Sequence, residues 1–242
     1  AQIDIGTITY TQWLNAEGKL EGDVTVTKLE DNKFLVIVTD TMHGHARTWL
    51  NRHLDPDGDK NVFVTDVTGA YSQLNIQGPY SRQFMEALAS VECPSGSTSS
   101  ESSQFSNDSF PFRAVREIAI GNARVYCSRI TYLGELGYEL YIPTEHSLHV
   151  YHRIQALRET AVGSPHLDLR LCGLKALASL RLEKGYRDYG HDMDNTDTLL
   201  EMGLGFTADM NKAGGFKGKD KVLAQRAQMR EEGGLRKRLV SI

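Results

Sequence analysis

The sequence is poor in several features that mark large classes of protein. Its 242 residues hold three cysteines, Cys93, Cys127 and Cys172, which are far apart and show no CxxC spacing. Such a set argues against a disulfide framework and a zinc site, and it favours a reducing compartment. No apolar run is long enough to span a bilayer, so no membrane partner is expected.

Clustered positive charge is also scarce. The formal net charge is −4, and the basic residues are scattered apart from the run Arg236 to Arg238. A nucleic-acid partner is therefore not expected. The first residues, AQIDIGTITY, lack a basic-plus-apolar signal segment, and both ends of the chain read as strands. This pattern predicts a fragment of a longer protein.

Periodicity and turn residues predict an α+β protein in which helices cover one face of mixed sheets. Strands are expected at 3–13, 24–29, 34–38, 61–67, 71–77, 112–120, 123–133 and 138–142. Helices are expected at 42–54, 80–91, 145–162 (with Thr144 as N-cap) and 169–184. The last helix carries a leucine stripe that is expected to enter the core, formed by Leu171, Leu174, Leu177 and Leu180.

One segment is unlike the rest in composition. Residues 93–109, CPSGSTSSESSQFSNDS, are rich in serine and poor in apolar side chains. Such a segment buries too little surface to offset its ordering entropy, so a mobile loop is expected.

Few of the common catalytic patterns are present. There is no GxSxG elbow, no cysteine with a nearby histidine and no glycine-rich phosphate loop after a strand. His43 and His45 are two apart on a predicted helix and are expected to be solvated. His191 lies beside two acids in YGHDMD, which fits either an oriented base or a simple loop cap.

Carboxylates in apolar strands are the more informative signal. The stretch TYLGELGYELYIP at 131–143 is either an exposed charged hairpin or one wall of a pocket. Asp23 begins an alternating apolar strand, where a carboxylate is costly unless it is paired or used. A turn aspartate that accepts bonds from backbone amides is the other interpretation.

Several longer segments carry a resemblance to a known family. They are TYLGELGYELYIP, LCGLKALASLRLEKGYRDYGHDM, LEMGLGFTADM, LNIQGP and GGFKGKDKVLAQRA. Together they resemble the aminomethyltransferase-like folate domain, which the glycine cleavage T-protein shares with sarcosine and dimethylglycine dehydrogenases. GDVTVT, GTITYTQWLN and SLRLEKGYRDYGHD look closer to the dehydrogenase branch.

The resemblance implies a fold of two ferredoxin-like lobes of mixed sheet with helices on one face, with a pocket between the lobes. Residues 1–54 and 161–213 would form the first lobe and 55–160 the second. Residues 214–242 would form a linker and the start of a C-terminal β-barrel.

The resemblance also implies site residues. The family's strand-borne tyrosine and glutamate match Tyr132 and Glu139, which would line the folate pocket, and its catalytic aspartate matches Asp23. Because a spacing of seven sends regular strand residues to opposite faces, the GELG segment must supply a turn or bulge. Glu135 would meet solvent there. No metal is implied.

One position departs from the T-protein pattern. Leu177 stands where the T-protein has an arginine, so contacts to the folate tail would come from Arg187 or Arg181.

The implied activity is folate-dependent one-carbon transfer. The chain would bind tetrahydrofolate and capture the carbon released by N-methyl amine oxidation as 5,10-methylenetetrahydrofolate. FAD would be held by an N-terminal domain outside this chain, consistent with the lack of a glycine fingerprint. The location would be the mitochondrial matrix in a eukaryote and the cytoplasm in a bacterium. Alternatives are a T-protein aminomethyltransferase and a non-catalytic module such as the regulatory subunit of pyruvate dehydrogenase phosphatase.

Overall fold

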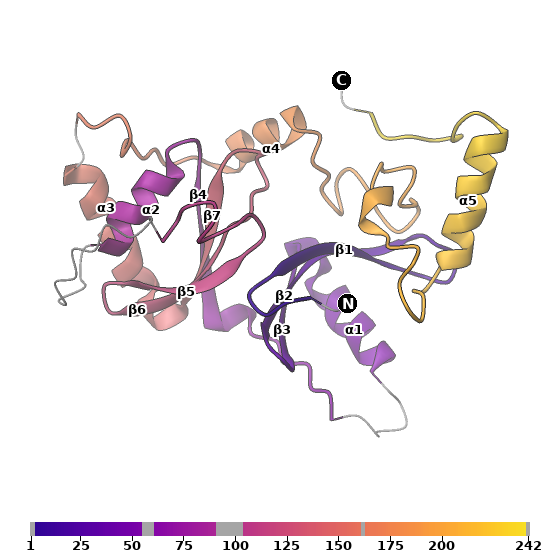
Figure 1. Ribbon diagram of the computed structural model, residues 1–242, viewed down its shortest axis with the longest axis horizontal. Helices are drawn as coiled ribbons and strands as arrows, with labels where there is room; N and C mark the ends of the chain where they lie inside the picture. Colours follow the sequence, from indigo (N-terminus) through magenta and orange to yellow (C-terminus); the bar gives the residue numbers. More distant parts are fainter. Residues whose placement is uncertain (1–2, 55–60, 91–103, 161–162, 241–242) are drawn as a thin grey trace. The chain divides into compact units, whose positions relative to one another are not determined.

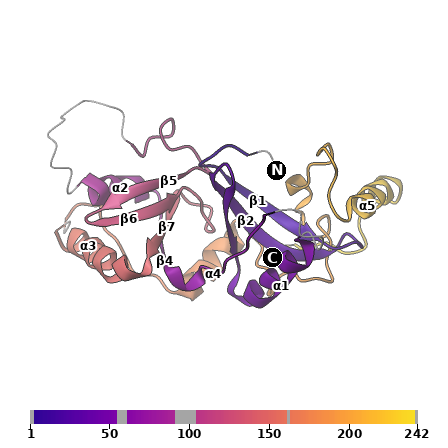
Figure 2. The same ribbon diagram turned by 90° about the horizontal axis from the view of Figure 1, so that it is seen from below.

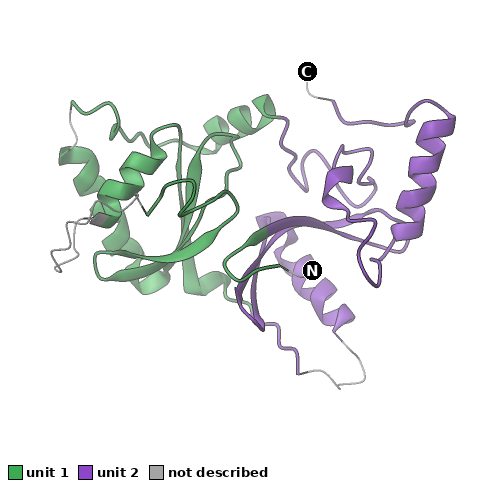
Figure 3. Ribbon diagram, in the orientation of Figure 1, with its two compact units in different colours: residues 1–8, 66–184 green, residues 9–65, 185–242 purple. Residues whose placement is uncertain are grey.

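The chain forms two compact units (Figure 3). The computed structural model describes residues 3–54, 61–90, 104–160 and 163–240. Unit 1 comprises Ala1–Ile8 and Asp66–Lys184, and unit 2 comprises Thr9–Thr65 and Gly185–Ile242. The lobe boundaries expected from the resemblance stay a prediction.

Unit 1 is built on a four-stranded sheet in the order β4-β7-β6-β5 (Figure 1). Its strands are β4 (Tyr71–Gln77), β5 (Val115–Ile120), β6 (Ala123–Ser128) and β7 (Gly137–Pro143). All three pairings are antiparallel, so the expectation of a mixed sheet is wrong here. The tight turn between β5 and β6 favours their antiparallel pairing, because a parallel connection needs a long crossover.

Helices cover one face of this sheet. α2 (Ser81–Ser90) and α3 (Ser147–Thr160) contact each other and the central strand β7. Their apolar side chains share a core with the buried residues of the strands. The helices on one face that the sequence predicts are therefore confirmed for this unit.

Alternation along β7 separates the core from the opposite face. Tyr138, Leu140 and Ile142 are fully buried in the core, whereas Glu139 and Tyr141 point to the other face. The partner strand β4 repeats the pattern, since Ile76 is buried while its neighbour Asn75 is exposed. The face away from the helices is thus polar.

The serine-rich segment is only partly described. Residues 91–103 lie outside the described residues. From 104 on the chain is packed, because Phe105 and Phe110 are fully buried against Tyr138. Arg82 of α2 donates to the carbonyl of Phe105 and, at 2.7 Å, to Asn107. The expectation of a mobile loop is therefore wrong for residues 104–109, because Phe105 and the following Phe110 supply the burial that the serines lack.

Unit 2 contains a three-stranded sheet in the order β1-β2-β3 (Figure 1), and α1 packs against it (Figure 2). The elements are β1 (Ile8–Leu14), β2 (Leu20–Glu30), β3 (Lys33–Val38) and α1 (His43–His53). Val24 of β2 packs against Met42 and Ala46 at the start of α1. The strands at 24–29 and 34–38 and the helix at 42–54 that the sequence predicts are confirmed.

A second core in unit 2 joins residues far apart in sequence. Leu14 and Leu20 pack against Met193, Leu199 and Val222, the last of which lies on α5 (Lys219–Glu231). The long segment between Gly185 and α5 is mostly turns, with one short 3₁₀ helix, η4 (Gly205–Thr207). In such a segment, individual hydrogen bonds hold the side chains in position more than a regular helix or strand does.

Three expectations about single elements are wrong. No strand forms at 61–67, whose residues are exposed. α4 is shorter than expected (Leu174–Glu183), and Leu174 is 82% exposed, so the leucine stripe does not enter the core of unit 1. Thr144 is not the N-cap of α3, which begins at Ser147, but the first residue of the 3₁₀ helix η3 (Thr144–His146), and its hydroxyl donates to the carbonyl of Gly69 at 2.8 Å.

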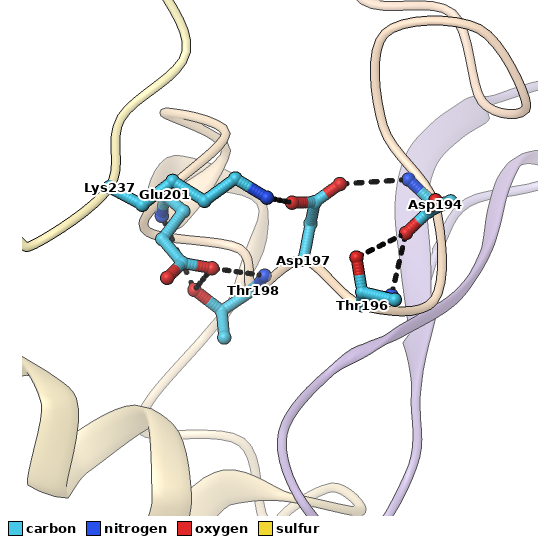
Figure 4. Close-up of polar contacts among 6 residues, drawn as sticks. All are labelled: Asp194, Thr196, Asp197, Thr198, Glu201 and Lys237. Atoms are coloured by element: carbon cyan, nitrogen blue, oxygen red, sulfur yellow. Dashed lines mark hydrogen bonds and ion pairs between the residues drawn. The ribbon is translucent and has the colours of Figure 1, made fainter.

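An ion pair connects the C-terminal segment to the turns of unit 2 (Figure 4). Lys237 donates to the buried carboxylate of Asp197, whose other oxygen accepts the backbone N–H of Asp194 at 2.9 Å. Two residues on, the N–H of Leu239 donates to the carbonyl of Glu201 at 2.9 Å. Between 213 and 240 the described chain contains α5 and no strand, so the expected barrel start is not seen.

None of the described helices combines the length and apolar character needed to cross a membrane.

Candidate functional site

Asp23 is held on the sheet of unit 2 by side chains of the neighbouring strand. Leu20, Gly22 and Val24 are buried on one face of β2, and alternation places Asp23 on the other. Gln12 of β1 donates from Nε2 to Asp23 Oδ1 at 2.6 Å. Tyr10, two residues earlier on β1, also forms a hydrogen bond with this carboxyl. Asp23 therefore does not serve as a turn aspartate.

Burial dominates the electrostatics of Asp23. Desolvation raises the pKa of this carboxyl from 3.8 to about 6, against the hydrogen bonds from Gln12 and Tyr10, which lower it. The negative charge of Asp188 raises it further. Both protonation states of Asp23 are thus accessible near neutral pH, which suits a group that accepts and returns a proton.

Gln12 is itself held by a third residue. Thr207, in η4, lies against the other end of the Gln12 carboxamide and donates to Oε1. The same hydroxyl contacts the carbonyl of Leu204 at 2.7 Å. The chain Thr207–Gln12–Asp23 thus links a turn 195 residues away to the sheet.

Arg187 lies in the same unit as Asp23. Its Nε donates to the carbonyl of Met202 at 2.7 Å, and its Nη1 donates to the carbonyl of Gly185. The positive charge of Arg187 lowers the pKa of Tyr10, although burial leaves that pKa raised overall. The two backbone carbonyls fix the position of the Arg187 guanidinium.

His191 belongs to a local turn. Its Nδ1 lies 3.3 Å from Asp188 Oδ2, and the N–H of Gly190 donates to the carbonyl of Met193 at 2.8 Å. The sequence left two roles open for this histidine, an oriented base or a loop cap. The structure shows the turn and the pairing with Asp188, and no contact of His191 with Asp23 among the described residues.

Glu139 occupies the polar face of unit 1. It lies on the central strand β7, opposite Asn75 of β4 and Ser128 of β6. Tyr141, two residues on and therefore on the same face, donates its hydroxyl to Glu139 Oε2 at 2.6 Å. Burial raises the pKa of Glu139, and hydrogen bonds from Tyr141 and Gln73 oppose that rise.

Tyr132 lies in the connection between β6 and β7, outside the strands. Gly134 in this connection has φ +74°, a left-handed conformation that glycine adopts without strain. The turn that the spacing of Tyr132 and Glu139 requires is therefore present. Glu135 is exposed there and lies 3.8 Å from Lys184, as expected for a solvent-facing residue.

The two units divide the expected site residues. Asp23 and Arg187 belong to unit 2, and Tyr132 and Glu139 belong to unit 1. Arg181, the other candidate for the folate tail, is only 6% exposed on α4. The described residues contain no group of three or more His, Cys, Asp or Glu side chains able to hold a metal.

A hollow of about 420 Å³ lies elsewhere in unit 2, at the start of α5. Its wall includes Lys217 and Gly218, and none of the expected site residues. Lys217 is already engaged, since its Nζ lies 2.8 Å from His53 and 4.8 Å from the ring centre of Trp49. We assign no role to this hollow.

Several residues that contact the carboxylates were not anticipated. Strand alternation alone could have paired Tyr141 with Glu139 and placed Tyr10 beside Gln12 on one face of β1. Thr207 had no such signal, because its contact with Gln12 depends on how a distant turn folds against the sheet.

Comparison with known proteins supports the resemblance seen in the sequence. The model of the GCVT N-terminal domain matches residues 1–212. The chain is 33% identical to 4-methylaminobutanoate oxidase (formaldehyde-forming) of Paenarthrobacter nicotinovorans, over 92% of this chain and 25% of that protein. It is 31% identical to the mitochondrial pyruvate dehydrogenase phosphatase regulatory subunit of Mus musculus, over 93% of this chain and 23% of that protein.

Further relatives fall in both enzyme groups named by the resemblance. The mitochondrial dimethylglycine dehydrogenase of Mus musculus is 29% identical over 98% of this chain and 25% of that protein. The aminomethyltransferase of Halothermothrix orenii is 33% identical over 98% of this chain and 58% of that protein. The chain thus spans about a quarter of the first relatives and just over half of the aminomethyltransferase.

A solved structure shows the same fold. The crystal structure of glycine cleavage system aminomethyltransferase T from Bartonella henselae matches with a TM-score of 0.65 and 20% identity. The match covers 94% of this chain and 55% of that one. Together with the match over residues 1–212, this shows that the chain belongs to the GCVT N-terminal domain family.

Proposed function

We propose that this chain is the tetrahydrofolate-binding part of a sarcosine/dimethylglycine dehydrogenase-like enzyme. In this role it captures the one-carbon unit from N-methyl amine oxidation as 5,10-methylenetetrahydrofolate. The observation that carries the proposal is the half-buried carboxyl of Asp23, which Gln12 and Tyr10 hold and whose pKa burial raises to about 6. Such a group is suited to take the proton released when a nitrogen nucleophile forms a bond to carbon.

The other residues would bind and orient the ligand. Glu139 presents a desolvated carboxylate on a polar sheet face, and a carboxylate can accept paired hydrogen bonds from an amino group and a neighbouring ring N–H. Tyr141 fixes this carboxylate through its 2.6 Å hydrogen bond. Tyr132 would contribute an aromatic surface, and Arg187 would attract the ligand's tail carboxylates.

Reduced folate supplies the nucleophilic nitrogens, and the residues described here fit that ligand because both carboxylates are held as hydrogen-bond acceptors. This chain lacks the glycine-rich fingerprint of a dinucleotide-binding site, so it offers no site of that kind for FAD. We therefore propose that an FAD-containing domain of the full-length protein is the partner that supplies the one-carbon unit. The location follows the relatives, in the mitochondrial matrix for a eukaryotic source and in the cytoplasm for a bacterial one.

Two other functions have support among the relatives. The similarity to the aminomethyltransferase favours transfer from a carried aminomethyl group, with the same folate site. The similarity to the phosphatase regulatory subunit favours a binding module without catalysis. The position of Leu177 argues against the first, and the presence of Asp23, Tyr132 and Glu139 together argues against the second.

Calorimetric titration with 5-formyltetrahydrofolate tests the proposal. The wild-type chain should bind, and Glu139→Gln should weaken binding about 10- to 100-fold, because it removes a charge-assisted acceptor. Glu135→Gln is the matched control, since Glu135 is exposed four residues away, and it should bind like wild type. A folded wild-type chain that releases no heat, in this form and within the full-length protein, would refute the folate site.

Asp23→Asn separates binding from proton transfer. It should keep affinity within a few-fold and lose one-carbon transfer in the full-length protein, because asparagine retains hydrogen bonds but cannot accept a proton. Equal loss of binding in Asp23→Asn and Glu139→Gln would assign Asp23 to ligand recognition instead.

A further inference from the structure

The hydrogen-bond chain beside Asp23 contains one proton too few for the acceptors it meets. The hydroxyl of Thr207 lies against two carbonyl oxygens, Gln12 Oε1 and Leu204 O. A hydroxyl has a single proton, so it can fully donate to only one of them at a time. The choice between these acceptors defines two arrangements of the chain.

When Asp23 is ionised, the arrangement is the one seen in the structure. The carboxylate is an acceptor only, and Gln12 Nε2 donates to it at 2.6 Å. Gln12 Oε1 then faces Thr207 and accepts its hydroxyl proton. Each acceptor in the hydrogen-bond series Thr207–Gln12–Asp23 then faces a donor. The Leu204 carbonyl, in turn, loses part of its hydrogen bond from Thr207.

When Asp23 is protonated on Oδ1, that arrangement places two donors against each other. The new O–H of Asp23 needs an acceptor, and Gln12 provides one if its carboxamide turns by 180°, so that Oε1 faces Asp23. Gln12 Nε2 then points at Thr207 Oγ, which accepts while donating its own proton to Leu204 O at 2.7 Å. Because the amide ends are similar in shape, the exchange needs no new space.

We propose that Gln12 is a positioning residue whose carboxamide reverses with the protonation state of Asp23, and that Thr207 is the hydroxyl that permits both orientations. Without this reversal, a proton on Oδ1 of Asp23 would face the Nε2 donor of Gln12, so the proton would be confined to the other carboxyl oxygen. The relay lets Asp23 take and return a proton without losing its position. A role of this reversal in catalysis rests on the proposed function, whereas the reversal itself is expected in the ligand-free chain.

Other groups near Asp23 could also respond to pH. Tyr10 hydrogen-bonds both Asp23 and Gln12, Asp188 adds negative charge, the charge of Arg187 acts on Tyr10, and the charge of Asp23 acts on Tyr189. The experiment must therefore separate a signal from Asp23 from one due to His191, which pairs with Asp188 at 3.3 Å.

Nuclear magnetic resonance of the ligand-free chain tests the proposal. The side-chain amide signals of Gln12 and the carboxyl signal of Asp23 would be followed from pH 4 to 8. Both should change with one shared midpoint, and Asp23→Asn should abolish the change at Gln12, whereas His191→Gln should retain it. A Gln12 amide that stays constant while Asp23 titrates would overturn the proposal, as would a change that survives in Asp23→Asn.

Variants of Thr207 provide a second test of the proposal. Thr207→Val keeps the shape but removes the oxygen that serves Gln12 as a donor in one arrangement and as an acceptor in the other, so the response of the Gln12 amide signals to pH should shrink. Thr207→Ser should restore the wild-type response. A Gln12 response that is the same in all three proteins would refute the role of Thr207. Since none of these measurements uses folate, their outcome is independent of whether the chain binds it.

Discussion

At the scale of single residues, the carboxylates of this chain differ sharply in environment. Asp23 and Glu139 are desolvated and held by neighbouring side chains, and burial raises the pKa of each. Glu135 and Asp31 are exposed and lie near lysines. Identical chemical groups thus acquire different properties from their surroundings alone.

The raised pKa of Asp23 predicts a specific dependence of stability on pH. Because the unfolded chain releases this proton near pH 3.8 and the folded chain near pH 6, Asp23 destabilises the fold as pH rises through that interval, and the penalty stays constant above it. Between pH 3.5 and 7.5, the unfolding free energy of Asp23→Asn should therefore gain up to about 3 kcal/mol relative to wild type. Denaturant unfolding at both pH values measures this difference.

Asp31→Asn is the control for that measurement. The Asp31 carboxylate is 85% exposed and 3.6 Å from Lys28, so its replacement should cause little pH-dependent change. A difference between Asp23→Asn and wild type that does not vary with pH would contradict the assignment of a desolvated Asp23.

At the scale of elements, the connection before β7 decides which residues face the core. Gly134 takes φ +74°, and the strand that follows places Tyr138 inward and Glu139 outward. A shift of one residue would exchange these faces, burying the carboxylate and exposing the aromatic ring. The glycine therefore contributes to the site through register.

Gly134→Ala should destabilise unit 1 by about 1–2 kcal/mol. Alanine is strained at this positive φ, and its Cβ would lie 2.2 Å from Cγ of Lys184, which must move aside. Gly44→Ala is a matched contrast, because Gly44 is inside α1 with nothing within 4 Å, and it should stabilise by about 0.5–1 kcal/mol. Thermal unfolding measures both; a neutral Gly134→Ala would mean that the turn does not depend on a left-handed residue.

At the scale of the whole molecule, contacts between distant segments complete unit 2. The sheet at the N-terminal end, the turns after Gly185 and the C-terminal segment share one core and one set of hydrogen bonds. Asp197 is central to them, since its backbone carbonyl accepts from Leu20 at 2.9 Å while its side chain accepts from Lys237 (Figure 4). The site around Asp23 and Thr207 depends on the same packing.

Lys237→Met should loosen the C-terminal segment. The replacement removes the cation from a carboxylate that is only 4% exposed, so the N–H of Leu239, which is bonded to Glu201, should exchange with solvent faster than in wild type. Arg238→Met is the control, because the structure shows no ion pair for Arg238 among its described residues. Hydrogen exchange followed by mass spectrometry measures both, and unchanged protection at Leu239 in Lys237→Met would show that the ion pair does not hold the segment.

The sequence by itself determined the family, most of the elements and the carboxylates of interest. Strand alternation was sufficient for β4 and β7, and helical spacing for α1, because these elements follow local propensity and have one buried face. The motif segments identified the family that the domain match confirms. The roles of Asp23, Tyr132, Glu139 and Arg187 in binding and catalysis remain predictions.

Only the tertiary structure decided which side chains surround those carboxylates. Leu174 fits a core stripe by spacing and is nevertheless exposed, and Phe105 lies in a serine-rich segment and is nevertheless buried. Thr207 reaches Gln12 across 195 residues, a contact that no local pattern encodes. Spacing fixes which residues share a face of a strand or helix, whereas burial and hydrogen bonding depend on what packs against that face.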